Sequence, residues 1–420
     1  MEICELTESE YESFLKKYSG QNFWQSNEML KFESKKGWKV YRIGLRKGNQ
    51  IKAVAGLISV PVFLSFTHFK ILRGPMMDYD DESTVKFFLK AISRFVKEHK
   101  GLIAEMDPYI AYQYHDMEGN LIQSDRNRVQ IIDWFESCGW RHQGFHKPLS
   151  DGEPRWMSVL PIDGKTCEEL FKEMNSKTRR NIHFVEKNCV KVRELRSDEL
   201  EVLEYFVNQT GERKHFYHPD LAYYQNLKEC FGDKMKAMYA YVDLDEYGDY
   251  INKQYGKAKE TLKREKEVLM EKPDSQKHIA KEKVYLKDLE VMTQKLEDFH
   301  QLKLVYDGVL PLSAALFIEN DREIVYLFSG SDDSLRKWKG SYAIQWHMIQ
   351  YAVKKKVERY NFYGISGNFH EDAQDYGVYI FKKGFHAEII ELPGNFMNVK
   401  RKFWYVVYKG LKRMKGLLGR

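Results

Sequence analysis

Basic side chains that could bind phosphate groups gather in two segments of the chain. The first contains Lys177, Arg179 and Arg180, on a helix predicted over residues 172–187. Contacts from such side chains to phosphates are independent of nucleotide sequence and weaken as salt rises. This cluster therefore fits either the acceptor stem of an RNA or a solvated helix face.

The second basic segment is the tail from residue 400 to residue 420. It alternates Lys and Arg with apolar residues at helical spacing: Trp404, Val407, Tyr408, Leu411 and Leu418. A basic helix with such a stripe can lie on an anionic membrane surface. Packing against its own domain is the alternative.

Two further side chains have types suited to catalysis. Asp107 ends a predicted strand and precedes a proline, a position where a carboxylate often accepts hydrogen bonds from backbone amides. Lys382 lies beside Lys383, and on its own this pair reads as surface cations. Neither pattern identifies a reaction without further context.

The cysteines predict neither disulfides nor a metal site. The chain has 5 of them, at positions 4, 138, 167, 189 and 230, with no Cys-x-x-Cys pair and no histidine at ligand spacing. No metal and no organic cofactor is implied.

Length and composition predict a folded protein with more than one domain. A chain of 420 residues exceeds the ~250 at which single cores stop growing. Its 43% hydrophobic and 30% charged residues exclude a disordered chain, and its net charge of +6 is a mild excess. No apolar run reaches the ~20 residues of a membrane span, and no signal peptide is visible, so we expect a cytoplasmic protein.

The elements that must position these residues recur twice. Strands at 52–60 and 69–76, a helix at 83–97 and a strand at 102–107 are followed far downstream by strands at 313–318 and 323–329, a helix at 341–355 and a strand at 359–364. Each unit is strand, strand, helix, strand. We therefore expect an α/β (α+β) protein with two similar domains.

A charged segment interrupts the second domain. Apolar residues recur at coiled-coil spacing from residue 247 to residue 302, and Pro273 breaks the pattern midway. We expect an antiparallel coiled-coil hairpin, either a spacer or a binding arm. The predicted domains are 1–150, then 151–245 with 303–395, the arm 246–302, and a basic amphipathic tail 396–420.

The repeated unit resembles the Gcn5-related N-acetyltransferase (GNAT) fold. That family marks its pyrophosphate site with a glycine-rich turn, whereas residues 336–343 here contain a single glycine. Too few small residues are present for backbone amides to approach a diphosphate, so coenzyme A binding is not expected.

The whole chain resembles the FemABX peptidyltransferases, which extend the peptide bridge of peptidoglycan using aminoacyl-tRNA. The matching motifs are Arg73-Gly-Pro-Met-Met-Asp-Tyr79, Met106-Asp-Pro-Tyr109, Arg155-Trp-Met-Ser-Val159, Gly340-Ser-Tyr-Ala-Ile-Gln-Trp346, Tyr360-Asn-Phe-Tyr-Gly364 and Phe381-Lys-Lys-Gly-Phe385. The inserted hairpin resembles members that act on membrane-bound lipid II. The resemblance implies two GNAT-like domains plus a helical arm, in agreement with the repeat.

The resemblance also implies a reaction and its residues. An amine of the peptidoglycan stem attacks the ester that links an amino acid, such as Gly, Ser or Ala, to tRNA. The Phe-Lys pair near the reacting carbonyl matches Phe381 and Lys382, and a lysine ammonium there stabilises the developing oxyanion. Asp107 matches an aspartate proposed as a base.

Substrate-binding positions follow from the same resemblance. A lysine three residues before an aromatic matches Lys35 ahead of Trp38, with Lys36 as an almost equal candidate, and Arg73 lies in a matching motif. Tyr223 matches a substrate-binding tyrosine. Pro219, however, occupies the position of the family's arginine, so Arg213 or His218 would have to supply the missing charge.

These observations predict a cytoplasmic aminoacyltransferase whose partners are aminoacyl-tRNA, lipid II or another muropeptide, and the inner face of the membrane. Two alternatives remain open: an acyltransferase that uses acyl-coenzyme A, and a non-enzymatic RNA-binding or scaffold protein. Turnover of charged tRNA would separate the first prediction from both.

Overall fold

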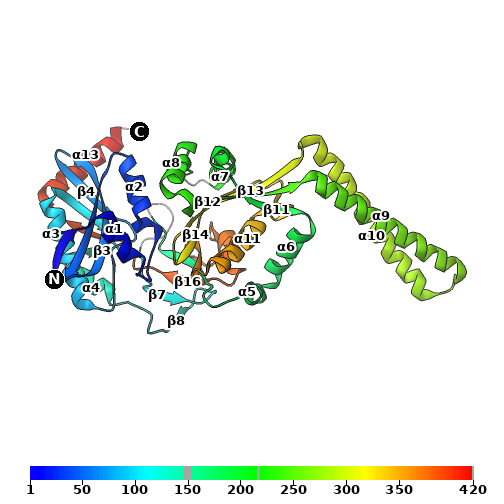
Figure 1. The fold of residues 1–420 in the computed structure, drawn as a ribbon, viewed down its shortest axis with the longest axis horizontal. Helices are drawn as coiled ribbons and strands as arrows, with labels where there is room; N and C mark the ends of the chain where they lie inside the picture. The colour runs from blue at the N-terminus through cyan, green and yellow to red at the C-terminus, as the bar shows by residue number, and fades with distance from the viewer. Residues whose placement is uncertain (146–152, 215–217, 419–420) are drawn as a thin grey trace.

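Two mixed β-sheets organise the chain, and a long helical hairpin projects from one end (Figure 1). The computed structural model describes residues 1–145, 153–214 and 218–418. In Figure 1 the first sheet lies at the left, the second in the middle, and the hairpin points to the right.

The first sheet has the strand order β1-β2-β3-β4-β6-β17-β9, with β5 paired to β3. Its strands are β1 (Glu2–Glu5), β2 (Lys39–Lys47), β3 (Gln50–Phe63), β4 (Phe66–Ile71), β5 (Met76–Met77), β6 (Gly101–Met106), β9 (Arg141–His142) and β17 (Phe396–Val399). Strands β4 and β6 are parallel, joined through helix α3 (Glu82–Glu98). This order confirms the first predicted strand-strand-helix-strand unit.

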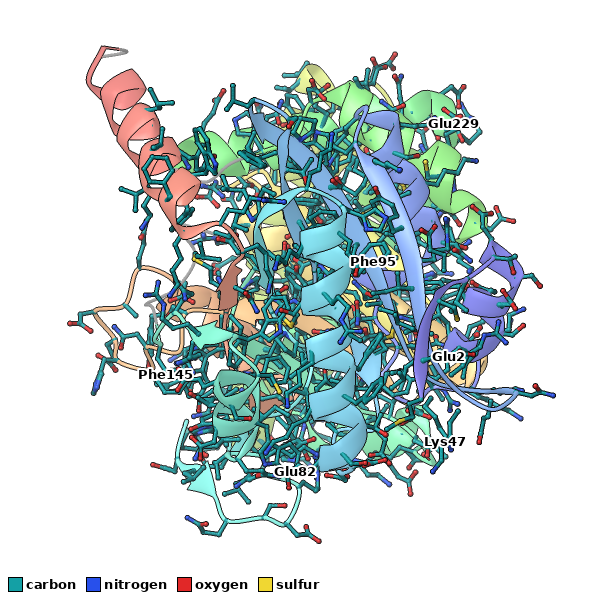
Figure 2. All side chains as sticks on the ribbon, turned by 90° about the vertical axis from the view of Figure 1, so that its left-hand side faces the viewer. Glu2, Lys47, Glu82, Phe95, Phe145 and Glu229 are labelled. Carbon is teal, nitrogen blue, oxygen red and sulfur yellow. The ribbon has the colours of Figure 1, made fainter. Side chains whose placement is uncertain are left out.

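Helices cover both faces of the first sheet. In Figure 2, α3 runs across the face toward the viewer between the labelled Glu82 and Phe95. Its apolar side packs on the sheet together with α4 (Ile131–Ser137). On the other face lie α1 (Glu8–Leu15) and α2 (Asn27–Lys35), through residues such as Tyr11 and Leu30.

The second sheet has the strand order β11-β12-β13-β14-β15-β10-β16-β7-β8. Its strands are β7 (Gln113–His115), β8 (Leu121–Ile122), β10 (Trp156–Pro161), β11 (Val190–Glu194), β12 (Met235–Asp243), β13 (Val309–Glu319), β14 (Glu323–Ser331), β15 (Arg359–Ile365) and β16 (Glu388–Glu391). Helix α11 (Gly340–Lys355) connects the parallel strands β14 and β15. The second predicted unit is therefore confirmed.

Helices on the second sheet divide between two cores. One core contains α5 (Cys167–Glu173), α6 (Ser176–Lys187) and α11, and the other contains α7 (Leu200–Lys214) and α8 (Leu221–Phe231). The single helix predicted over 172–187 is wrong at its start. Asn175 breaks it, because its side chain accepts a hydrogen bond from the Thr178 amide at 2.8 Å and begins α6.

The two sheets exchange strands along the chain. Strands β7 and β8 precede residue 150 yet belong to the second sheet, and β17 follows residue 395 yet lies in the first sheet between β6 and β9. Sheet membership does not by itself define an independently folding unit. The division at residues 150, 245 and 303 therefore stays a proposal.

The hairpin consists of α9 (Leu244–Glu271) and α10 (Gln276–Val305). The break falls at residues 272–275, which contain Pro273, as the sequence predicted. At its base, Phe299 packs so closely on Gly248 that a Cβ at that glycine would overlap the ring.

The C-terminal segment differs from the tail predicted at 396–420. Its first four residues form β17, because Phe396 and Asn398 are buried in the first sheet. Helix α13 (Lys402–Leu418) follows, and the structure describes nothing beyond residue 418. Val407 and Tyr408 of the predicted stripe are half-buried, whereas Phe403 and Val406 are exposed. The side chain of Leu418 lies outside the described residues.

Candidate active site

Lys382 is buried, not a surface cation. It lies near the end of helix α12 (Tyr376–Lys383) with 4% of its area exposed, and its Nζ donates a hydrogen bond to the Gly364 carbonyl at 2.6 Å. Burial lowers the pKa of Lys382 to about 7, although the charge of Asp375 acts in the opposite direction. A lysine of this kind changes charge near neutral pH.

The carbonyl that accepts the Lys382 hydrogen bond belongs to Gly364, near the end of strand β15. Pro154 packs so tightly on Gly364 that a side chain at this glycine would overlap the ring. The Pro154 carbonyl in turn accepts a hydrogen bond from Arg73 Nη2 at 2.7 Å. This chain of contacts connects Lys382 with the polar residues that follow strands β4 and β6 of the first sheet.

Arg73 and Asp107 form a buried pair where β4 and β6 end. Asp107 Oδ1 accepts the Arg73 backbone N–H at 2.8 Å, and Oδ2 lies 3.4 Å from Arg73 Nη1. Burial raises the pKa of Asp107, against the lowering effect of the Arg73 charge. The amide contact fits the role of a structural cap, and a catalytic role for Asp107 stays a prediction.

Glu153, Tyr363 and Trp24 complete this group, although the sequence predicted a site role for none of them. The Tyr363 hydroxyl donates to the Glu153 carboxylate and accepts from Trp24 Nε1 at 3.3 Å. Burial raises the pKa of Glu153 to about 7, while Arg73, whose Nη2 is 3.7 Å away, opposes the shift. We call Trp24, Arg73, Asp107, Glu153, Tyr363 and Lys382 the strand-end cluster.

The backbone of one residue in the strand-end cluster has an unusual conformation. Tyr363 adopts a left-handed conformation, with φ of 66°, which is uncommon for a residue with a large side chain. Its motif, residues 360–364, was noted in the sequence, but no spacing rule connects it with Glu153. Only the fold brings the two residues together.

Phe381 points away from this polar group. Its ring lies 5.0 Å from that of Tyr342 and 5.3 Å from that of Phe385, within the aromatic part of the core that α11 forms with the second sheet. Phe381 therefore holds α12 on its neighbours, and direct action on a substrate stays a prediction.

The predicted substrate-binding residues of α2 and α8 do lie together. Phe32 packs edge-on against Tyr223, with ring centroids 5.2 Å apart, and Lys35 forms an ion pair with Glu229 of α8. Lys36 donates to Glu33 at 2.8 Å and lies 5.0 Å from the Trp38 ring centre. Arg73 belongs to the strand-end cluster instead.

The two candidates for the missing arginine are both engaged elsewhere. Arg213 Nη1 forms an ion pair with Asp333 at 2.7 Å. His218 packs against Gly211, where a Cβ would overlap its ring, and Pro219 is buried. In the described structure, therefore, neither Arg213 nor His218 supplies the positive charge of the family's arginine, whose position Pro219 occupies.

The basic cluster on α6 lies next to the end of α12. The Asn175 amide donates to the Gly384 carbonyl at 3.1 Å, two residues after Lys382. Lys177 and Arg180 are exposed, whereas Arg179 Nη1 donates to the Lys172 carbonyl at 2.7 Å and so caps α5. The fold thus brings these basic residues close to the buried lysine.

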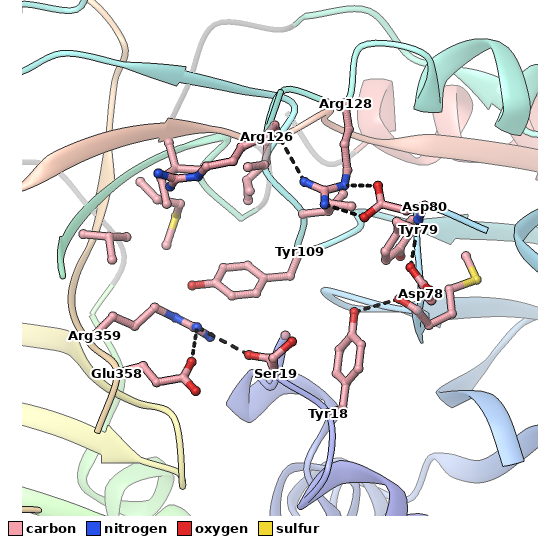
Figure 3. Close-up of a pocket in the computed structure, with 18 of the residues that line it drawn as sticks. Tyr18, Ser19, Asp78, Tyr79, Asp80, Tyr109, Arg126, Arg128, Glu358 and Arg359 are labelled. Atoms are coloured by element: carbon pink, nitrogen blue, oxygen red, sulfur yellow. Dashed lines mark hydrogen bonds and ion pairs between the residues drawn. The ribbon is translucent and has the colours of Figure 1, made fainter. Parts of the chain in front are cut away.

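A separate cavity of about 810 Å³ opens between the two sheets (Figure 3). Tyr109 crosses it and hydrogen-bonds Glu323 at 3.0 Å, and Arg128 holds Asp80 through two hydrogen bonds of 2.9 and 2.8 Å. Arg359 donates to the Gln21 carbonyl at 3.0 Å, which joins the second sheet to the first domain. None of the predicted site residues lines this cavity.

No helix within the described residues is long and apolar enough to cross a membrane.

Comparisons with known proteins agree on one family. The model of the FemAB family matches residues 6–413. The chain is 34% identical over 421 residues to the aminoacyltransferase FemA of Staphylococcus aureus strain bovine RF122, covering 99% of each protein. It is 34% identical over 417 residues to the aminoacyltransferase FemA of Staphylococcus epidermidis strain RP62A, covering 99% of this chain and 100% of the relative.

Among solved structures, the crystal structure of FemX superposes with a TM-score of 0.80 at 20% identity. The alignment covers 97% of this chain and 99% of that chain. At this identity the match establishes the fold alone, which is the mixed α/β architecture that the sequence predicted.

Proposed function

Because the chain belongs to the FemAB family, we propose that it transfers an amino acid from aminoacyl-tRNA to an amine of the lipid II stem peptide. The chain is an aminoacyltransferase of peptidoglycan bridge synthesis. The donor is proposed to be tRNA charged with Gly, Ser or Ala. The acceptor is proposed to be lipid II or another muropeptide.

The buried position of Lys382 beside the basic helix α6 carries the proposal. Phosphates of the tRNA 3′ end would contact Lys177 and Arg180, and the ester to be cleaved would then reach the end of α12. A lysine whose ammonium sits in a water-poor site stabilises negative charge more strongly than an exposed one.

The reaction is an aminolysis. The acceptor amine attacks the ester carbonyl, a C–N bond forms, and the C–O bond to the tRNA ribose breaks as its hydroxyl leaves. Negative charge develops on the carbonyl oxygen, and the Lys382 ammonium is proposed to stabilise it. Releasing a proton from a lysine-type amine of pKa ~10.4 at pH 7 costs about 4.6 kcal/mol, so this assistance matters.

The residues of α2 and α8 are proposed to hold the acceptor. Lys35 and Lys36 would contact its phosphates, and Trp38 and Tyr223 would contact its sugar or peptide. Lys35 must leave Glu229 to do so, since the two form an ion pair in this structure. With Pro219 in place of the family's arginine, Arg213 would also have to leave Asp333 before it could bind the diphosphate.

The proposed function also implies where the chain works. Charged tRNA and lipid II meet at the cytoplasmic face of the membrane, and we propose that the chain works there as a peripheral protein. The basic helix α13 supports this proposal, since its side chains would be attracted to anionic lipid.

Transfer assays test the function directly. The purified chain is incubated with lipid II and with tRNA carrying radiolabelled Gly, Ser or Ala, and the label in lipid II is counted. The expected result is transfer from at least one of the charged tRNAs. Labelling from an acyl-coenzyme A, or RNA binding without any turnover, would instead support one of the two alternatives.

A further inference from the structure

The turn between β3 and β4 has a residue that the fold does not explain. Leu64 and Ser65 form a two-residue hairpin loop, where Asn, Asp and Gly are favoured because they tolerate positive φ. Leu64 has φ of 51° and is 73% exposed. A large apolar side chain here strains the backbone and buries almost nothing.

Helix α13 packs beside this loop. The Trp404 ring centre lies 5.9 Å from that of Phe66, and the Arg401 guanidinium lies 5.2 Å from the Phe66 ring centre. On the outer side of the helix, Phe403 is 71% and Val406 69% exposed. Two elements that contact each other thus each carry exposed apolar side chains.

The charged side chains of α13 and of the β3–β4 loop have one sign. No acidic residue follows Glu391 in the chain, and residues 61–70 contain none either. Lys402, Lys409 and Lys412 on α13 are exposed. Glu105 of β6 lies at the margin of this surface, where it pairs with His68 at 3.0 Å and is also influenced by Lys412.

The helical arm offers an instructive contrast. Met270 is 82% exposed there, yet acidic and basic residues alternate around it, as in Lys266-Glu-Val-Leu-Met-Glu-Lys272. An exposed apolar residue within mixed charge does not select an anionic partner. The surface of the β3–β4 loop and α13 combines apolar side chains with uniformly basic ones, which is the pattern of interfacial membrane binding.

We propose that Leu64, Phe403 and Val406, surrounded by the lysines of α13, insert into the headgroup region of an anionic bilayer. The β3–β4 loop is thus a second membrane contact beside the helix. The proposal deepens the proposed function, because a lipid-linked acceptor lies at such a surface. Vesicle binding is measured without aminoacyl-tRNA or lipid II, so its result does not depend on whether the proposed transfer reaction is correct.

The position of this surface suits the candidate site. Figures 1 and 2 both show α13 and the helix α8, which carries Glu229, at the upper margin of the molecule. A bilayer that contacts α13 would therefore lie on the same side of the molecule as Lys35 and Tyr223. A lipid-linked acceptor would have to extend only along that side.

Leu64→Asn gives a sharp test, because Asn suits the left-handed backbone and keeps the turn. The full-length protein is sedimented with vesicles of phosphatidylcholine containing phosphatidylglycerol, at low and high salt. We expect at least fivefold weaker binding for Leu64→Asn and for Phe403→Gln/Val406→Gln, and binding to the phosphatidylcholine-only vesicles should be weak for every form. Met270→Asn, the matched control on the arm, should bind as the wild type does.

Several outcomes would overturn the proposal. Wild-type binding by Leu64→Asn, with an unchanged or raised melting temperature, would remove the loop from the membrane-binding surface. Equal binding to neutral and anionic vesicles would refute the role of charge. A change in oligomeric state in these variants would show that a second copy of the chain covers the surface. A protein that binds vesicles but transfers no amino acid would refute the proposed function and leave this surface standing.

Discussion

At the residue scale, the burial of Lys382 decides both its chemistry and its effect on stability. Its Nζ has the Gly364 carbonyl as a hydrogen-bond acceptor at 2.6 Å, and burial lowers its pKa to about 7. The charge is therefore available for catalysis near neutral pH but costs folding free energy.

Lys382→Met should separate these two effects. Turnover should fall roughly 10²- to 10³-fold with little change in KM, because the ammonium acts on charge that develops in the transition state. In the unfolded chain Lys382 keeps its proton up to pH ~10.4, whereas in the folded protein it loses it near pH 7. The charged lysine therefore lowers the free energy of unfolding by its full amount below pH 7, and this destabilisation disappears as the pH rises from 7 to ~10.4. At pH 6 the variant should be about 1–3 kcal/mol more stable in urea, even without the hydrogen bond to Gly364. Unchanged turnover would remove Lys382 from the mechanism.

The pH dependence of kcat/KM should report the charge of Lys382. The free fraction of the acceptor amine rises tenfold per pH unit, while the charged fraction of Lys382 falls tenfold per unit above about pH 7. The logarithm of kcat/KM should thus rise with a slope of about 1 below pH 7 and level off above it. Lys382→Arg, which stays charged, should continue to rise. Slopes near 2 and then 1 in the wild type would indicate that neutral Lys382 acts as a base.

Glu153 should affect stability with the opposite dependence on pH. Burial raises its pKa to about 7, so the folded protein binds more protons than the unfolded chain between pH ~4.3 and 7, and stability falls as pH rises through this window. Glu153→Gln should be more stable than the wild type at pH 8 by a few kcal/mol, and the difference should vanish near pH 4. Urea denaturation at both pH values measures this, and equal differences would contradict the assigned burial.

At the element scale, α6 connects the proposed RNA-binding residues with the buried lysine. Asn175 begins the helix and binds Gly384, so Lys177 and Arg180 are held at a defined position relative to α12. Arg179 also caps α5, which gives it a structural role beside any binding of RNA.

Changing Lys177, Arg179 and Arg180 to Ala should raise the KM for charged tRNA and flatten its salt dependence. Removing one phosphate-binding side chain reduces the slope of log K against log salt by about 0.7–0.9. The matched control replaces Lys16, Lys47 and Lys90, which are exposed on the first domain, and removes the same charge. The proposal for this cluster fails if both triple variants have the same salt slope while circular dichroism confirms their folds.

At the scale of the whole molecule, contacts around the cavity between the two sheets hold the sheets together. The hydroxyl of Tyr109, which follows β6, donates to Glu323 of β14, and Arg359 of β15 donates to the Gln21 carbonyl. The strand-end cluster also spans both sheets, since Arg73 and Asp107 follow strands β4 and β6 of the first sheet, whereas Tyr363 lies in β15 of the second sheet and Lys382 in α12. Relative movement of the sheets would therefore change the site.

Truncation after Lys400 removes α13 and should separate membrane binding from catalysis. Each Lys or Arg near anionic lipid contributes about 1 kcal/mol, so the truncation should reduce activity on liposome-embedded lipid II more than on a soluble muropeptide analogue. Co-sedimentation with anionic liposomes should fall in parallel. Equal reductions on both substrates would mean that α13 stabilises the first sheet, where the Tyr405 hydroxyl contacts Met397 of β17.

Local elements were largely determined by the sequence. The alternation of apolar residues predicted both strand-strand-helix-strand units, and Pro273 marked the break in the arm, because periodicity and turn residues act over a few neighbouring positions. Motif resemblance also singled out Lys382 and Asp107, whose catalytic roles stay predictions. The strand predicted to continue to residue 76 instead ends at Ile71, because Arg73 turns in a left-handed conformation to meet Asp107.

Only the tertiary structure determined the burial, the contacts and the pKa shifts of these residues. The burial of Lys382, the pairing of Glu153 with Tyr363 and the crossing of β7, β8 and β17 between sheets join positions far apart in the chain. A pKa depends on the dielectric and charges around the group in three dimensions, which no spacing along the sequence specifies. The sequence determined which groups are present, and the packing of α12 beside β15 determined that Lys382 can change charge near pH 7.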